Sequence, residues 1–436
     1  MKICIIGAGY VGLVVGACLA DMGNDVICTD NNEQKLELLN QGIIQMYERG
    51  LEDLIKANVA KKRLIFSSDV KKAVEESPVC FITVGTPQKD DGGAELKYVK
   101  EAAKIIGQSM KQYTVVVNKS TVPVGTAGLV SDIIKMQTNV DFDVVSNPEF
   151  LRQGNSVNDF LNPERIIIGS DSQRAVEIMR ELYNPLLKAG CPVILMDVKS
   201  AEMTKYAANA FLALKISYAN EIANICEKTG ANADMVRTGM CSDKRIGSQY
   251  LHSGLGYGGS CLPKDVNALI KIAAENNCDY GLLKAVDEIN KKQRKSFTEK
   301  ILEFYGNDIT DKTVAIWGLA FKPETNDMRE APAIDIVNQL LEKGARIQAY
   351  DPKAFEQAKS YFGDKIVYSN SAYEALEKAD CLVLVTEWQE FKQPDFAKIK
   401  LLLKEPTIFD GRNQYNGDKL IQAGFNYICI GKNLTK

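Results

Sequence analysis

The chain has 436 residues, of which 45% are hydrophobic and 25% charged, a composition typical of a globular protein with two or three domains. Its 53 basic and 56 acidic side chains nearly balance, which argues against a nucleic acid partner. The uncharged run at 3–20 lacks a basic leader and contains four glycines, so we expect neither a signal peptide nor, in the absence of another long apolar run, a membrane span.

Residues 1 to about 196 alternate between short apolar runs and helical patterns. KICII (2–6), the glycine-rich turn GAGYVG, a helical pattern and DVICTD (25–30) form one β-α-β unit. Further strands are predicted at 79–84, 113–117, 142–146, 165–169 and 192–196. This alternation indicates a parallel sheet with helices on both faces.

The pattern changes at Ser200, where an Ala-rich helix without Gly or Pro runs to Lys228 and helical segments continue to about Gly306. We interpret the long helix as a spine and dimer surface. After Asp311 the alternation returns with TVAIWG, ARIQAYD, CLVLV and TIFD. This second Rossmann-like block has only the lone Gly318 after its first strand, so we interpret it as a degenerate copy that binds a different nucleotide or none.

The fold class predicted is therefore α/β, with two Rossmann-like, doubly wound parallel-sheet domains joined by a long central helix and a helical dimerisation region. The predicted boundaries are 1–199 for the N-terminal Rossmann domain, 200–306 for the central helical domain, and 307–436 for the second Rossmann-like domain.

The turn after the first strand carries a dinucleotide-binding fingerprint. Gly7, Gly9 and Gly12 follow a strand and open a helix, which brings phosphates to the positive end of the helix dipole. Asp30 ends the second strand, where its carboxylate would accept hydrogen bonds from the adenosine ribose and repel a 2'-phosphate. We expect NAD rather than NADP.

Histidine and cysteine usage limits the remaining chemistry. His252 is the single histidine of the sequence, which excludes a serine-histidine catalytic set and a multi-histidine metal site, so we expect no metal. The eleven cysteines lack CxxC pairs, which favours free thiols in the cytoplasm over disulfides.

One cysteine ends a glycine-rich segment. Cys261 closes the run GLGYGGSC, with Lys264 and Asp265 one helical turn beyond it, near enough to tune a thiolate if a helix starts there. A flexible loop with an incidental buried cysteine is the alternative.

A second pair lies on the long helix. Lys205 and Asn209 are four residues apart and share a face, where they could act as acid or base and as an orienting amide. By itself, such a pair is more often a solvated helix face.

Taken together, several segments closely resemble the UDP-glucose/GDP-mannose dehydrogenase family. They cover nearly the whole chain in order and are GAGYVG, STVPVGT (120–126), NPEFLRQG (147–154), KYAANAFLALKISYANE (205–221), GLGYGGSCLPKD (254–265) and FKPETNDMREAP (321–332). The resemblance implies an NAD-dependent oxidation of the sugar C6 alcohol to a carboxylate in two hydride transfers. It also implies a homodimer built on the long helix and a C-terminal domain for the UDP-sugar.

Residue roles follow from the same resemblance. Cys261 matches the family's nucleophile, which forms a thiohemiacetal and then a thioester, and Lys205 its acid or base, with Asn209 beside it. Thr121, Glu149 and Asp265 match residues that position or activate water for the hydrolysis. Cofactor contacts are implied for Gly7, Gly9, Val11, Gly12, Asp30, Lys35, Thr121, Gln153, Lys264 and Arg329.

The implied UDP-sugar contacts include an arginine, Arg245, that reaches the neighbouring subunit's substrate. The full set is Glu149, Phe150, Leu151, Arg152, Gln153, Lys205, Asn209, Arg245, Tyr250, Leu251, His252, Ser253, Gly254, Gly258, Lys322 and Arg412. Two positions depart from the family pattern. Gln153 replaces a glutamate near the cofactor, and His252 stands where many members have lysine or asparagine.

Within the family the chain looks most like the members that oxidise UDP-glucose, with GDP-mannose and UDP-N-acetylhexosamine as alternative substrates. A two-electron dehydrogenase of the 3-hydroxyacid type needs neither the cysteine loop nor a second α/β domain. A catalytically silent nucleotide-sugar sensor would not need Cys261, Lys205 and Asp265 together.

Overall fold

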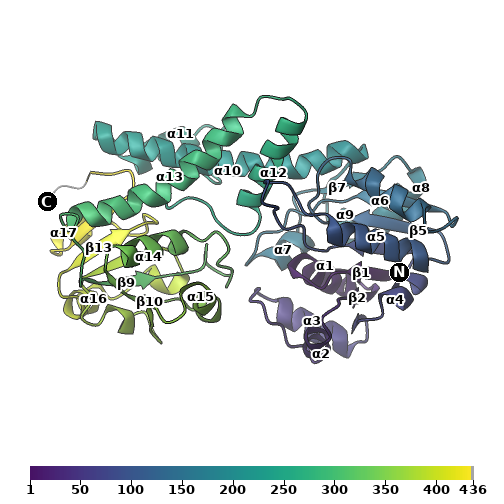
Figure 1. The fold of residues 1–436 in the computed structure, drawn as a ribbon, viewed down its shortest axis with the longest axis horizontal. Helices are drawn as coiled ribbons and strands as arrows, with labels where there is room; N and C mark the ends of the chain where they lie inside the picture. Colours follow the sequence, from purple (N-terminus) through teal and green to yellow (C-terminus); the bar gives the residue numbers. More distant parts are fainter. Residues whose placement is uncertain (434–436) are drawn as a thin grey trace. The chain divides into compact units, whose positions relative to one another are not determined.

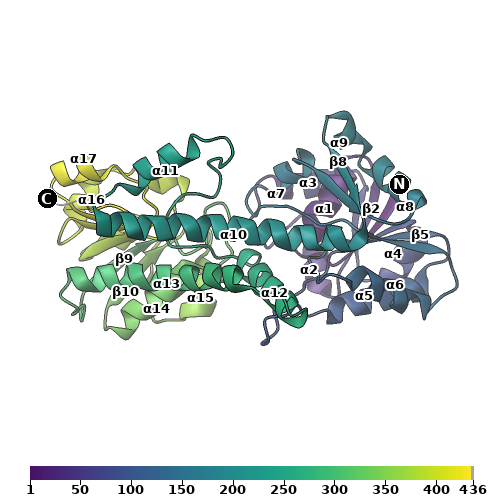
Figure 2. The ribbon, with the colours of Figure 1, turned by 90° about the horizontal axis from the view of Figure 1, so that it is seen from above.

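The computed structural model describes residues 1–433 and divides into two compact units, one of Met1–Ala208 and one that begins at Asn209. Each unit is built on one open, twisted sheet with helices packed against it (Figures 1 and 2). Within the described residues, no helix combines the length and the apolarity needed to cross a membrane.

The first unit holds an eight-stranded sheet in the order β3-β2-β1-β4-β5-β6-β7-β8. Its strands are β1 Lys2–Ile6, β2 Asp25–Thr29, β3 Leu64–Ser67, β4 Val79–Ile82, β5 Thr114–Asn118, β6 Phe142–Ser146, β7 Ile166–Gly169 and β8 Val193–Met196. β1 lies between β2 and β4, so the strand order reverses beside it. In sheets of this kind ligands bind outside the carboxyl ends of the strands at that point.

Helices cover both faces of this sheet because its strands are apolar on both sides. Ile3 and Ile5 of β1 pack into one core with α1 and α3, whereas Cys4 and Ile6 pack into a second core with α4, α5 and α6. The helices of this unit are α1 Tyr10–Asp21, α2 Glu33–Asn40, α3 Leu51–Ala60, α4 Val70–Glu76, α5 Lys97–Ser109, α6 Thr126–Lys135, α7 Ser156–Leu161, α8 Gln173–Leu182 and α9 Asn184–Lys188.

One strand pairing differs from a fully parallel sheet. β6 meets β7 antiparallel, through the single pair Ser146 and Gly169, and β8 then runs parallel to β7. The connection explains the difference. α7 has only 6 residues and spans roughly 9 Å, too little to carry the chain back along a strand for a parallel crossover.

The predicted long helix is confirmed as α10, Val198–Thr229, whose 32 residues include the boundary between the two units. The other helices of the second unit are α11 Ala233–Cys241, α12 Leu262–Glu275, α13 Gly281–Phe304, α14 Pro332–Glu342, α15 Phe355–Phe362, α16 Phe396–Leu402 and α17 Gly417–Gln422.

The second unit has a six-stranded parallel sheet in the order β11-β10-β9-β12-β13-β14, as a doubly wound domain requires. Its strands are β9 Thr313–Trp317, β10 Arg346–Tyr350, β11 Val367–Tyr368, β12 Cys381–Leu384, β13 Thr407–Asp410 and β14 Asn426–Cys429. The prediction of two Rossmann-like domains with a long central helix is confirmed.

The second sheet repeats the first glycine turn in degenerate form. Gly318 has φ +90° and its N–H donates to the Tyr350 carbonyl at 2.8 Å, as Gly7, with φ +103°, donates to the Thr29 carbonyl at 2.9 Å. Asp351 follows β10 as Asp30 follows β2, but Asp351 Oδ2 accepts from the backbone N–H of Leu319 (2.7 Å) and from Trp388 Nε1 (3.0 Å). In all, the Asp351 carboxylate accepts five internal hydrogen bonds, against three at Asp30, so it is less able to accept further hydrogen bonds from a ribose.

Candidate active site

The glycine turn of the first unit has the geometry that a pyrophosphate requires. A Cβ on Gly12 would lie 1.9 Å from the Gly7 carbonyl oxygen, so glycine lets α1 pack closely on the turn. A Cβ on Gly9 would meet no atom within 4 Å, and no side chain caps the start of α1. The first-turn amides of α1 are thus available to phosphate oxygens, and the turn fits a dinucleotide.

Asp30 lies at the carboxyl end of β2, beside this turn. Its Oδ2 accepts from the Ala8 N–H at 3.1 Å and from Lys35 Nζ at 2.8 Å. The Asp30 carboxylate is mostly buried, with 14% of the side chain exposed. Lys35 therefore orients the carboxylate without replacing its negative charge, which stays unfavourable for a 2'-phosphate.

We expect the variant Asp30→Ala to lose NAD affinity by about tenfold or more, because a charge-assisted hydrogen bond to the ribose is removed. The preference for NAD over NADP should relax rather than reverse, since Lys35 loses its partner and can face a phosphate. Initial rates with both cofactors test this. Asp25→Ala, at the exposed start of the same strand, is the control. Equal catalytic efficiency of the unmodified protein with NAD and NADP would contradict the assignment.

Lys205 is buried against the loop at 147–154. Its Nζ lies 3.1 Å from Glu149 Oε1 in an ion pair whose side chains are 5% and 7% exposed. The same ammonium lies 5.2 Å from the Phe150 ring centroid, and Glu149 Oε2 accepts from the Leu151 N–H at 2.6 Å. The alternative of a solvated helix face is therefore excluded for Lys205.

A buried lysine that the sequence reasoning missed accompanies this pair. Lys119 is 4% exposed, and its Nζ donates to Asn147 Oδ1 at 2.9 Å. Burial lowers the pKa of Lys119 to about 8, opposed by the charge of Glu149 and assisted by that of Lys205. Lys119 lies between the buried strand β5 and the segment STVPVGT, and this position in the sequence could have identified it as a candidate site residue.

The lowered pKa of Lys119 predicts a pH-dependent contribution to stability. Between its folded value of about 8 and the ordinary 10.5, the unfolded chain holds a proton that the folded chain has released. The unfolding free energy should therefore rise with pH in this window, by at most roughly 1.4 kcal/mol per pH unit from this group. Urea unfolding of the unmodified protein and of Lys119→Met checks it. Their difference should climb from pH 8 upward, and parallel pH profiles would contradict the prediction.

The loop that carries Thr121 is held by two residues that the sequence reasoning also missed. Thr86 Oγ1 donates to the Thr121 carbonyl at 2.8 Å. Glu202, on α10, accepts from the N–H groups of Gly125 (2.6 Å) and Ala127 (2.8 Å). Thr86 belongs to the segment TVGTP after β4, next to the strand-order reversal, a position that could have drawn attention to it.

In the second unit, Cys261 is the N-cap residue of α12, so the helix predicted beyond it is present. The thiol is partly exposed. A Cβ on Gly258 would lie 2.2 Å from the Glu330 carbonyl oxygen, and one on Gly259 would lie 2.8 Å from the Phe321 ring. These glycines let the loop pack closely enough to hold Cys261 at the helix end, where the dipole stabilises a thiolate.

Polar groups surround the first turn of α12. Asp265 is 1% exposed and accepts from Asn209 Nδ2 at 2.6 Å and from Lys264 Nζ. The Gly259 N–H donates to the Arg329 carbonyl at 2.8 Å. Hydrogen bonds to Asp327 raise the pKa of the Arg329 guanidinium, which also feels the charge of Cys261.

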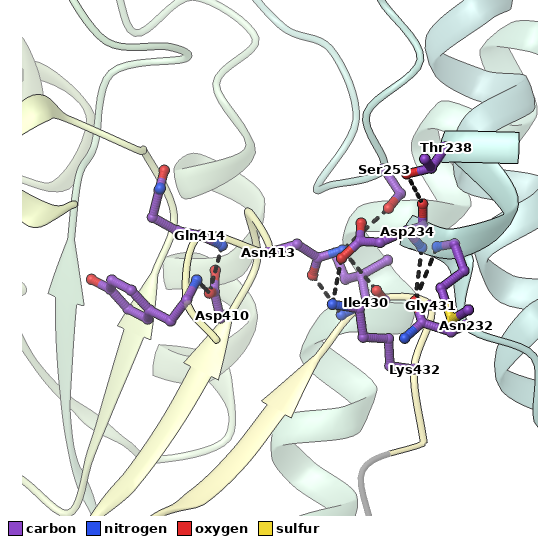
Figure 3. A network of polar contacts seen from close by, with 12 residues as sticks. Asn232, Asp234, Thr238, Ser253, Asp410, Asn413, Gln414, Ile430, Gly431 and Lys432 are labelled. Atoms are coloured by element: carbon purple, nitrogen blue, oxygen red, sulfur yellow. Dashed lines mark hydrogen bonds and ion pairs between the residues drawn. The ribbon is translucent and has the colours of Figure 1, made fainter. Parts of the chain in front are cut away.

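The segment 250–254 is fixed by amide side chains. Gly254 donates through its N–H to Asn220 Oδ1 at 2.8 Å, and its carbonyl accepts from Gln293 Nε2 at 2.9 Å. Asn413 Nδ2 donates to Ser253 Oγ (3.2 Å) and to the Ile430 carbonyl (2.8 Å), contacts visible in Figure 3. The loop is thus tied to the turn that carries Arg412.

The remaining predicted residues have varied surroundings. Arg412 Nε donates to the Val385 carbonyl at 2.6 Å and lies 3.1 Å from Glu387 Oε2. Arg152 pairs with Asp159. Arg245 is 88% exposed and pairs with Asp243, an exposure that would let it reach another chain. Among the others, Leu251 and Gly254 are buried, and His252 is exposed. Tyr250 has a positive φ of +64°. The half-buried residues are Val11, Thr121, Phe150, Gln153 and Lys322.

Three family models match the chain in order. The UDP-glucose/GDP-mannose dehydrogenase family matches with its NAD binding domain over residues 1–187, its central domain over 199–292 and its UDP binding domain over 315–417.

Similar proteins match over nearly the full length. UDP-glucose 6-dehydrogenase TuaD of Bacillus subtilis (strain 168) is 47% identical over 99% of this chain and 93% of its own length. UDP-glucose 6-dehydrogenase of Rhizobium meliloti (strain 1021) is 46% identical over 99% and 100%. A solved UDP-glucose dehydrogenase from Pyrobaculum islandicum superposes with a TM-score of 0.91 at 34% identity, covering 98% of this chain and 96% of that one.

Proposed function

Because the chain belongs to the UDP-glucose/GDP-mannose dehydrogenase family, we propose that it oxidises UDP-glucose at C6 to UDP-glucuronate. NAD is the cofactor and accepts one hydride in each of the two oxidation steps. The observation that carries the proposal is Cys261, an accessible thiol at the N-terminus of α12 in a glycine-bounded loop. The similar bacterial proteins named UDP-glucose 6-dehydrogenase, at 44–47% identity, favour UDP-glucose over other nucleotide sugars.

The role of Cys261 is to retain the aldehyde between the two oxidations. Its thiolate adds to the aldehyde carbon and forms a thiohemiacetal, whose oxygen takes up a proton. Loss of hydride from the former aldehyde carbon, together with the hydroxyl proton, leaves a thioester. Water then attacks the thioester carbonyl, the carbon–sulfur bond breaks, and the carboxylate leaves as the thiol is restored.

Lys205 is the proposed acid or base of the first oxidation, and its ammonium also stabilises the oxyanions formed later. Burial of Lys205 against Glu149 supports this role, because a low-dielectric site strengthens its field. Asp265, Glu149 and Thr121 are proposed to position or activate the hydrolytic water, and Asn209 is proposed as the amide that orients the alcohol beside Lys205. The hydrogen bond that Asn209 Nδ2 donates to Asp265 Oδ2 fixes that pair in one geometry.

The binding residues retain their predicted assignments as proposals. Gly7, Gly9, Val11, Gly12, Asp30, Lys35, Thr121, Gln153, Lys264 and Arg329 are assigned to NAD. The loops at 149–153 and 250–254, with Gly258, Lys322 and Arg412, are assigned to the UDP-sugar. The boundaries 1–199, 200–306 and 307–436 and a cytoplasmic location are likewise proposed. The location is supported by eleven cysteines that form no disulfide within the described residues.

An initial-rate screen tests the substrate. Purified protein with NAD is given UDP-glucose, GDP-mannose or a UDP-N-acetylhexosamine, and NADH absorbance is followed. We expect UDP-glucose to have the highest kcat/KM and to yield two NADH for each sugar consumed. A single NADH per sugar would favour a two-electron dehydrogenase, and no turnover with any of the three would favour a sensor.

We also propose that the active unit is a homodimer formed along α10. Phe211, Tyr218 and Ile225 recur every seven residues on this helix and are 60%, 44% and 52% exposed. On α11, Met235 is 73% exposed. An apolar stripe at heptad spacing is suited to pairing with the same stripe of a second copy about a two-fold axis.

The paired substitution Phe211→Glu and Ile225→Glu should therefore yield a folded monomer with little activity, because Arg245 would lose access to the neighbouring chain. Light scattering and turnover are measured at the same protein concentration. Met136→Glu, at an apolar position on the first unit that is 73% exposed, should keep both mass and activity. A fully active monomer would refute the proposed assembly.

A further inference from the structure

Glu48 joins two segments of the first unit. One is the dinucleotide turn, which the proposed function assigns to NAD, and the other is the loop at 147–154, which it assigns in part to the UDP-sugar. Glu48 lies between α2 and α3 and is 3% exposed. Its carboxylate accepts three hydrogen bonds, from Tyr10 Oη at 2.6 Å, from the Gly154 N–H at 2.6 Å and from the Ser156 N–H at 2.9 Å. Tyr10 is the first residue of α1, directly after Gly9, and Gly154 directly follows Gln153.

Capping accounts for only part of this arrangement. The bonds from Gly154 and Ser156 resemble those of a carboxylate at the start of α7 and need no third donor. The third donor is a side chain from the dinucleotide turn, and Tyr10 Oη and the Gly154 N–H share the same oxygen, Oε2. A single oxygen of Glu48 therefore accepts hydrogen bonds from both the dinucleotide turn and the loop at 147–154.

The Tyr10 hydroxyl is kept as a donor. Burial, followed by the charge of Glu48, raises the pKa of Tyr10, so the phenol stays protonated at working pH. Hydrogen bonds to a buried carboxylate are shorter and stronger than neutral ones. The bridge is therefore a rigid link between α1 and the loop at 147–154, which carries Glu149 in its ion pair with Lys205.

We propose that Glu48 is a positioning residue that sets the loop at 147–154 against the dinucleotide turn, acting through Tyr10. The inference rests on the proposed function for its effect on turnover, but not for its effect on NAD binding. A displacement of reacting groups by about 1 Å can reduce turnover on the order of a hundredfold, so a residue outside the site can act strongly in this way.

The variants separate positioning from stability. Tyr10→Phe removes only the link to the turn and leaves both backbone donors on Glu48. Glu48→Gln preserves the shape of the side chain but replaces one acceptor oxygen with an NH2 group. At least one of the three donors therefore loses its acceptor. Glu52→Gln, in an ion pair with Lys56 whose side chains are both 52% exposed, is the matched control on the neighbouring helix.

We expect Tyr10→Phe to keep the melting temperature within about 2 °C of the unmodified protein, since both backbone donors remain paired. Its NAD dissociation constant should rise about threefold or more, and kcat with UDP-glucose should fall about tenfold. Glu48→Gln should show at least these effects. The double variant should be no worse in kcat than Glu48→Gln alone, because both changes break the same link.

Two results would overturn the proposal. One is a Tyr10→Phe protein with the NAD affinity and kcat of the Glu52→Gln control. The other is a double variant whose losses equal the product of the two single losses, which would show independent roles. The NAD dissociation constant is measured without sugar, so failure of UDP-glucose as a substrate would leave that comparison intact.

Discussion

Replacement of Cys261 by alanine is expected to lower the steady-state rate with UDP-glucose by a factor on the order of 10³ or more, because no covalent intermediate can form. NAD should bind as before, since the glycine turn belongs to the first unit and is untouched. Cys261→Ser keeps a nucleophile with far less anion at neutral pH, so it should also turn over slowly. It should, however, accumulate a sugar ester, because an ester hydrolyses more slowly than a thioester.

The measurement is the intact mass of each variant after incubation with UDP-glucose and NAD, together with the NADH released. A mass increase is expected for Cys261→Ser and none for Cys261→Ala. Cys278→Ser, at an exposed cysteine in the same unit, should match the unmodified protein. If Cys261→Ala produced two NADH per sugar at the unmodified rate, the cysteine would be structural and the proposed mechanism would fail.

The variant Lys205→Met should lose both activity and stability. Turnover is expected to fall by roughly 10²–10⁴, the range for removal of a positioned acid or base. The same change leaves Glu149 buried without its ion-pair partner, which costs about 3 kcal/mol of unfolding free energy. The positive charge of Lys119 also acts on Glu149, so the lost unfolding free energy should be near the lower end of the range for breaking a buried ion pair.

The double variant Lys205→Met with Glu149→Gln separates the two effects. It removes the uncompensated charge, so most of the lost stability should return in urea unfolding, while turnover stays low. Lys56→Met breaks an exposed pair with Glu52 and should cost less than about 1 kcal/mol. Full activity in the double variant would remove Lys205 from the proposed mechanism.

Local pattern in the sequence was enough to predict most of the framework. The runs at 2–6, 142–146 and 407–410 are strands, the run at 25–30 contains the strand Asp25–Thr29, and the helix from 200 to 228 lies within α10. The exceptions are informative. The strands Leu64–Ser67, Val367–Tyr368 and Asn426–Cys429 were not predicted. Each lies at the edge of its sheet with at most some of its side chains buried, so it gives a weaker apolar signal than a central strand.

The sequence also determined the candidate chemistry, since the glycine turn with Asp30 and the loop ending at Cys261 are contiguous signals whose geometry is set by neighbouring residues. Only the tertiary structure decided how charges are paired. That Lys205 meets Glu149, that Lys119 is buried beside them, and that Glu48 joins Tyr10 to Gly154 all depend on segments far apart in the chain. Burial and hydrogen bonding between such segments arise from packing, which a local pattern of residue types does not encode.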